Sequence, residues 1–136
     1  LALRRGPIKG FVACGLVYGL LTCLTDGYGL ATFPFDYLIG FGSTCALGFV
    51  SKYVFADERK FYDWIGILLI VAGGVVATCL RLLGSTISSM VIYDYTFVDG
   101  IVYNATYIPL QGLFALVVTV ALYGPLQKLN KAYPVR

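Results

Sequence analysis

The chain has 136 residues, of which 59% are hydrophobic and only 12% are charged, and its formal net charge at pH 7 is +3. Because soluble domains carry about 25% charged residues, this composition excludes an ordinary soluble protein and predicts a bilayer-embedded chain with no separate soluble domain. We expect no nucleic-acid partner. The chain begins at Leu1 without Met, so we expect the N-terminal part of a longer protein to be missing.

Four apolar segments follow one another, at about 8–25, 35–55, 64–92 and 101–126. A membrane-crossing helix needs about 20 such residues. The segments are continuously apolar rather than alternating, which favours helices over the strands of a β-barrel. We therefore predict an all-α integral membrane protein whose residues 1–136 form a single transmembrane helical bundle.

The basic residues indicate how the chain lies in the membrane. Nine of the ten lie at or beyond the start of the first segment, from the end of the second to the start of the third, or after the fourth: Arg4, Arg5, Lys9, Lys52, Arg59, Lys60, Lys128, Lys131 and Arg136. The connections around Asp26 and from Asp94 to Asp99 contain no Lys or Arg. By the positive-inside rule, both ends are cytoplasmic in a multi-pass plasma-membrane protein, and these two connections face outward.

The predicted outer side is rich in acids and aromatic rings. It holds the acids Asp26, Asp36, Asp94 and Asp99 and the aromatics Tyr28, Phe33, Phe35, Tyr37, Tyr93, Tyr95 and Phe97. A carboxylate and aromatic faces together suit a desolvated organic cation. An interfacial aromatic belt is the alternative, and it explains the rings but not the excess of acids.

Asp36 stands at the mouth of the second apolar segment, and no charge follows it until Lys52. An acid at that depth in a membrane protein is a hypothesis for a functional site. The alternative is that Asp36 only caps the helix that begins there.

Arg81 is the one basic residue outside the cytoplasmic set. It lies 18 residues beyond Asp63, or about 27 Å along a helix, so we expect it near the outer edge, paired with Asp36 or Asp99. On the same helix face follow the polar side chains Ser85, Ser88 and Ser89. The alternatives are a purely structural ion pair and ordinary hydrogen bonding between helices by the serines.

The fourth segment opens with Asn104, Thr106 and Tyr107, which are too polar to face lipid, and Pro109 predicts a kink just after them. Polar groups beside a broken helix are a common way to build a transporter site. The sequence contains no nucleotide-binding loop, catalytic triad or metal cluster, so we expect neither an enzyme nor a cofactor.

Several of these residues occur together in a known order. They are Leu3-Arg4-Arg5-Gly6, Tyr18-Gly19-Leu20-Leu21, Asp36-Tyr37, Arg81 with Ser85, Ser88 and Ser89, and Tyr103-Asn104-Ala105-Thr106-Tyr107. In this pattern the chain resembles the thiamine-specific substrate-binding subunit (S-component) of energy-coupling factor transporters, over essentially its whole length. The resemblance implies six helices in the family, of which these are the last four.

The resemblance also implies roles for individual residues. Asp36 and Tyr37 would bind the aminopyrimidine of thiamine, Tyr93 would stack on the ligand, and Asn104 matches the family's site Asn. This chain departs from the family at Ser85, where many members have His, and at Asp99, where a site Tyr is expected, which leaves a related cation open as the ligand. The expected substrate-binding residues are Asp36, Tyr37, Arg81, Ser85, Tyr93, Asp99, Asn104 and Tyr107.

By this resemblance the protein would capture thiamine from outside, and a transmembrane coupling subunit and two cytoplasmic ATPases would drive its uptake. Two other functions stay open from the residues alone. One is a small proton-coupled exporter of organic cations that uses Asp36 as its acid, and the other is a structural membrane subunit without a ligand.

Overall fold

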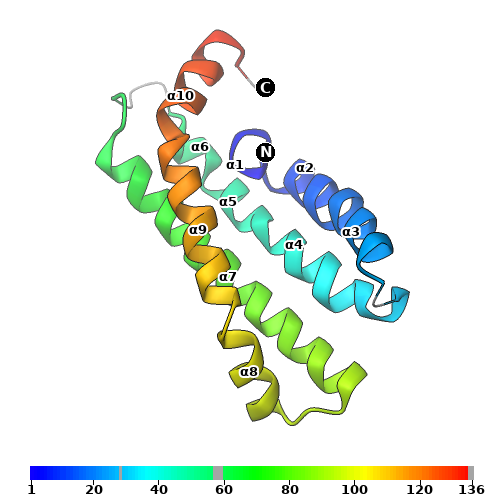
Figure 1. Cartoon of the computed structure of the whole chain (residues 1–136). Coiled ribbons are helices and arrows are strands. Elements are labelled where there is room, and N and C mark those ends of the chain that lie inside the picture. Colours follow the sequence, from blue (N-terminus) through cyan, green and yellow to red (C-terminus); the bar gives the residue numbers. More distant parts are fainter. Residues whose placement is uncertain (28, 57–59, 135–136) are drawn as a thin grey trace.

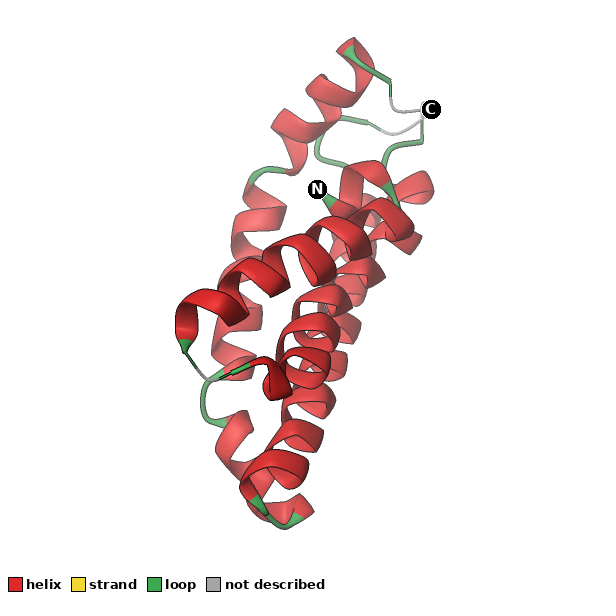
Figure 2. Ribbon diagram, turned by 90° about the vertical axis from the view of Figure 1, so that its right-hand side faces the viewer, coloured by secondary structure: helices red, strands yellow, loops and turns green. Residues whose placement is uncertain are grey.

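The computed structural model describes residues 1–27, 29–56 and 60–134. These residues form helices and contain no strand, as Figure 2 shows. The elements are α1 (Ala2–Arg5), α2 (Pro7–Phe11), η1 (Val12–Tyr18), α3 (Gly19–Asp26), η2 (Leu30–Thr32), η3 (Phe33–Ile39), α4 (Gly40–Gly42), η4 (Ser43–Cys45), α5 (Ala46–Phe49), α6 (Ser51–Val54), α7 (Trp64–Tyr93), α8 (Phe97–Ala105), α9 (Ile108–Ala121) and α10 (Tyr123–Ala132). The prediction of an all-α membrane protein is confirmed.

Two of the described helical runs are long and apolar enough to cross a membrane, namely Pro7–Asp26 and Trp64–Tyr93. The first joins α2, η1 and α3, and the second is α7. The pair α8 and α9 would make a third if the bent pair counts as one span. The expected span 35–55 corresponds to several short helical pieces between Leu30 and Val54, which are not among these runs.

The helix α7 has clear signals at both ends. The side chain of Asp63 caps its start by accepting a hydrogen bond of 3.3 Å from the Gly66 amide. Its last helical residue is Tyr93, after which Asp94 takes the left-handed conformation with φ 53°. Left-handed residues commonly end helices. The resulting helix of 30 residues is close to the predicted segment.

The fourth apolar segment is not one continuous helix. It divides into α8 and α9, which meet at an angle of 41°. Pro109 stands in the first turn of α9, has no amide to donate, and its ring would clash with the carbonyl of Ala105 four residues earlier. The predicted kink is therefore confirmed, and the break comprises Thr106 and Tyr107, which lie three and two residues before the proline.

The apolar core lies toward the end of the bundle that holds the two chain termini (Figure 1). It consists of Leu3, Val54, Ile70 and Tyr123, of which the last three are fully buried. The Tyr123 hydroxyl donates a hydrogen bond of 3.1 Å to the Val54 carbonyl. Because this end is packed with side chains, the space for a ligand must lie elsewhere.

Glycines allow the first two helical runs to approach closely. Gly15 packs against the backbone of Gly42 and Leu38, and Gly19 packs against the Tyr37 carbonyl. Small residues commonly permit such close contact between membrane helices. The contact at Gly19 fixes the backbone of Tyr37, which belongs to the cavity described next.

Candidate functional site

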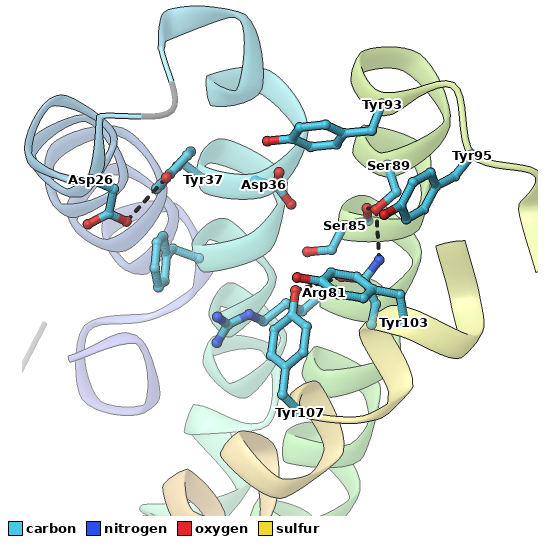
Figure 3. A pocket seen from close by; sticks show the side chains of 12 residues that line it. Asp26, Asp36, Tyr37, Arg81, Ser85, Ser89, Tyr93, Tyr95, Tyr103 and Tyr107 are labelled. Carbon is cyan, nitrogen blue, oxygen red and sulfur yellow. Dashed lines mark hydrogen bonds between the residues drawn. The ribbon is translucent and has the colours of Figure 1, made fainter. Parts of the chain in front are cut away.

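A cavity of about 570 Å³ lies between the helical run that starts at η3, the second half of α7, and α8 (Figure 3). Ligand pockets typically measure about 300–1,000 Å³. Twelve residues line the cavity: Asp26, Asp36, Tyr37, Phe41, Arg81, Ser85, Ser89, Tyr93, Tyr95, Tyr103, Asn104 and Tyr107. The structure thus brings together every expected binding residue except Asp99.

Asp36 is held between two helices. It lies in the first turn of η3, is partly buried, and one of its carboxylate oxygens accepts a hydrogen bond of 2.6 Å from the Ser88 hydroxyl on α7. Thr32, not Asp36, precedes this helical turn. The carboxylate therefore binds a side chain on a neighbouring helix, so its role is not confined to capping its own helix.

Tyr37 connects the cavity to the end of the first helical run. Its ring is 6% exposed, and its hydroxyl donates a hydrogen bond of 3.2 Å to the Asp26 carboxylate. The ring also lies 6.1 Å from that of Phe41, centroid to centroid. Asp26 is thereby placed as a second acid at the cavity, as Figure 3 shows at its left side.

Arg81 does not form the expected ion pair. Among the described residues its guanidinium lies over the Phe41 ring, 5.1 Å from the centroid, and no carboxylate is within salt-bridge distance. Each of the two expected partners is engaged elsewhere. Asp36 accepts its hydrogen bond from Ser88, and Asp99 accepts one of 2.6 Å from the Thr96 hydroxyl.

Asp99 lies outside the cavity. It is exposed near the start of α8, where its amide donates a 3.2 Å hydrogen bond to the hydroxyl of Thr96, the residue that precedes the helix. The Thr96 hydroxyl therefore caps the helix and also binds the Asp99 carboxylate. Asp99 therefore has a structural task at the helix end, away from the other seven residues.

Asn104 is the centre of a buried network that joins α7 to α8. Its amide donates hydrogen bonds of 3.0 Å to the Ser89 hydroxyl and 2.8 Å to the Gly100 carbonyl. Its carbonyl oxygen accepts one of 2.6 Å from the Tyr107 hydroxyl. Because Asn104 is only 1% exposed, these bonds fix both Ser89 and Tyr107 at the cavity wall.

The serines on α7 face inward, as expected from their spacing, since Ser85, Ser88 and Ser89 are all buried. Ser88 and Ser89 bond to other helices, in agreement with the alternative of interhelical hydrogen bonding. Ser85 differs, because none of the described residues forms a hydrogen bond with its hydroxyl, which lines the cavity.

Four tyrosines form a continuous aromatic wall. Successive ring centroids are 6.4 Å apart from Tyr93 to Tyr95, 6.2 Å from Tyr95 to Tyr103, and 5.9 Å from Tyr103 to Tyr107. Such a wall offers negative ring faces to a cation. Together with two acids and one base, which sum to a formal charge of −1, it suits a singly charged organic cation.

The family described as "Thiamine transporter protein (Thia_YuaJ)" matches residues 1–131 of this chain. The chain belongs to this family. No curated protein and no solved structure shows a significant match. As a member of a thiamine transporter family with apolar helices of membrane-spanning length, it is a membrane transport protein.

Sequence reasoning about this thiamine transporter family member missed five of the cavity residues: Asp26, Phe41, Ser89, Tyr95 and Tyr103. Four had signals that pointed to them. Asp26 and Tyr95 belong to the acids and aromatic rings of the predicted outer side. Ser89 shares a helix face with Ser85, and Tyr103 precedes Tyr107 by about one helical turn. Phe41 had none, because an aromatic residue in an apolar segment reads as a lipid-facing or core residue.

Proposed function

We propose that the cavity binds thiamine from the outer side of the membrane and that the protein is the substrate-binding subunit of an energy-coupling factor transporter. The observation that carries the proposal is the placement of Asp36. Its carboxylate is anchored by Ser88 at a cavity walled with tyrosines. In thiamine, the aminopyrimidine can donate a hydrogen bond to such a carboxylate, and the thiazolium ring supplies the positive charge.

The two ends of the ligand would meet different parts of the wall. The amino group of the pyrimidine is a donor that matches Asp36, since an ionised carboxylate only accepts hydrogen bonds. The charged thiazolium matches the tyrosine faces, where each cation–π contact is worth about 0.5–2 kcal/mol depending on desolvation. The cavity is large enough for both rings.

The proposed orientation follows from charge and from the bundle. The connections α3–η2 and α7–α8, next to the cavity, lie toward one end, and the termini lie toward the other (Figure 1). By the positive-inside rule the termini are cytoplasmic, so the cavity would face outward. Energy would then come from a transmembrane coupling subunit and two cytoplasmic ATPases on other chains, as the family resemblance implies.

Isothermal titration calorimetry on the full-length protein in detergent tests the proposal. We expect thiamine to bind saturably with one molecule per chain. Oxythiamine, in which an oxo group replaces the amino group, removes the donor that faces Asp36, and we expect it to bind at least about tenfold more weakly. Absence of thiamine binding would reject the proposal, and proton release on binding of unrelated organic cations would favour the exporter.

A further inference from the structure

Asp26 carries a negative charge at a place where its own helix is not stabilised by one. It is the last helical residue of α3, and the chain turns directly after it at Gly27, whose φ is 77°. The C-terminus of a helix already bears partial negative charge, so an acid in the last turn is unfavourable there. The contacts of the carboxylate, and not the helix, therefore have to account for Asp26.

The Asp26 carboxylate accepts a hydrogen bond of 3.2 Å from the Tyr37 hydroxyl, and both residues line the cavity (Figure 3). The tyrosine itself is held firmly. Its backbone packs against Gly19, its ring lies 6.1 Å from that of Phe41, and the residue is only 6% exposed. The freedom that remains to this side chain is rotation of the hydroxyl hydrogen, and Asp26 fixes that as well.

The direction of this hydrogen bond decides what Tyr37 can offer to the cavity. A phenol has one hydrogen to donate and two lone pairs that accept, whereas an ionised carboxylate only accepts. With its hydrogen directed to Asp26, the Tyr37 oxygen is left as an acceptor. Its chain neighbour Asp36 is an acceptor too, with one carboxylate oxygen left after the bond to Ser88. This part of the wall therefore matches a ligand group that has two N–H donors.

We propose that Asp26 is a positioning residue that makes the site select an amino group over an oxo group, by holding the Tyr37 hydroxyl as an acceptor. The inference rests on the proposed function, because it concerns the same aminopyrimidine that faces Asp36. Asp26 itself needs no contact with the ligand. Without it, the Tyr37 hydroxyl can turn its hydrogen into the cavity and donate to an oxo group, and part of the selectivity is lost.

Calorimetry with thiamine and oxythiamine, on the full chain in detergent, tests this role. Asp26→Ala frees the hydroxyl hydrogen of Tyr37. We expect it to weaken thiamine binding about threefold to tenfold, the effect of one hydrogen bond, and to weaken oxythiamine binding less or not at all. The ratio of the two dissociation constants should thus fall at least about threefold. A packing role alone would weaken both ligands equally, and an unchanged ratio would overturn the inference.

Asp26→Asn is the conservative variant that separates the bond from the charge. Its amide oxygen still accepts the hydrogen of Tyr37, while the negative charge is gone. We expect the ratio for thiamine and oxythiamine to stay within about twofold of that of the unchanged protein. If Asp26→Asn lost as much selectivity as Asp26→Ala, the carboxylate would act by its charge on the ligand, and the proposed role of the Tyr37 bond would be overturned.

Tyr37→Phe shows whether Asp26 acts through the hydroxyl. We expect this variant to lose selectivity as Asp26→Ala does, and the double variant to differ from Tyr37→Phe by no more than about twofold in either dissociation constant. Losses that multiply would overturn the inference. Melting in detergent without ligand checks the fold, and Asp26→Ala should not melt lower, because an unfavourable acid leaves the helix end. If the unchanged protein binds no thiamine, the proposed function fails together with this inference. If it binds thiamine and Asp26→Ala keeps the ratio, only the inference fails.

Discussion

The Ser88 hydroxyl on α7 donates a hydrogen bond of 2.6 Å to one carboxylate oxygen of Asp36, although the two residues are 52 positions apart in the chain. The other carboxylate oxygen has no hydrogen-bond partner among the described residues. This bond orients the carboxylate at a cavity wall and connects η3 to α7. A substitution at Asp36 that removes the negative charge but keeps an acceptor for Ser88 therefore tests binding without breaking this contact between the helices.

Asp36→Asn is expected to weaken thiamine binding at least tenfold, about 1.4 kcal/mol. The amide oxygen of Asn can still accept the hydrogen bond from Ser88, so the helices should stay packed. The other side-chain atom changes from an anionic acceptor to a donor, which cannot pair with the amino group of the pyrimidine. Titration by quenching of intrinsic fluorescence measures the change in affinity.

Asp94→Asn is the matched control for this prediction. Asp94 is exposed, lies outside the cavity, and has a left-handed backbone with φ 53°, which Asn tolerates well. The Asp94→Asn substitution removes one negative charge from the same end of the bundle as Asp36→Asn does. If Asp94→Asn weakened thiamine binding as much as Asp36→Asn, the effect would come from the overall electrostatic field and not from a contact at Asp36.

Much of the fold could be predicted where a helix carries local signals. Continuous apolar runs predicted the helices, and Asp63 and Pro109 marked the start of α7 and the kink before α9. The break after Ala105 was harder to place, because the clash of a proline ring acts on the carbonyl four residues earlier. The short pieces between Leu30 and Val54 have no comparable signal in the residues.

The site could be predicted where spacing along one helix decides which way a side chain points. It could not be predicted where several groups compete as partners of one side chain. The inward face of Ser85, Ser88 and Ser89 follows from steps of three and four. The partner of Arg81 does not follow from spacing, because a long flexible side chain can reach several groups, and Ser88 already binds one oxygen of Asp36. The helix cap formed by Thr96 could have been recognised from its spacing to Asp99, and it would have indicated a structural role for Asp99.

Tyr93→Ala is expected to weaken thiamine binding by about 1–2 kcal/mol, the size of a desolvated cation–π contact. Tyr93→Trp keeps an aromatic face at the same place and should preserve the affinity. Tyr133→Ala, at an exposed tyrosine outside the cavity, is the control and should have no effect. Calorimetry that gives equal affinity for Tyr93→Ala and the unchanged protein would reduce Tyr93 to an interfacial residue.

Single cysteines test the orientation, in a protein whose four native cysteines are replaced by Ala. Ala31 and Thr96 are exposed near the cavity end of the bundle, and Ala56 is exposed near the other end. Cysteines at the first two positions should react with an impermeant reagent on intact cells, because their connections lack basic residues. A cysteine at Ala56 should react only after lysis. The opposite labelling pattern would reverse the topology and put the cavity on the cytoplasmic side.

Gly48→Ala is expected to lower the stability by about 1–3 kcal/mol, the usual cost of overpacking. A methyl group there would lie 2.6 Å from backbone atoms of Gly6 and Pro7, and backbone atoms cannot move aside as a flexible side chain can. At Gly40, by contrast, the nearest atoms to an added methyl are 3.8 and 3.9 Å away, which is ordinary contact. Gly40→Ala should therefore leave the melting temperature in detergent unchanged or raise it, since Ala is the better helix former. A Gly48→Ala protein that melts at the same temperature as Gly40→Ala would contradict the close contact between α5 and the start of α2.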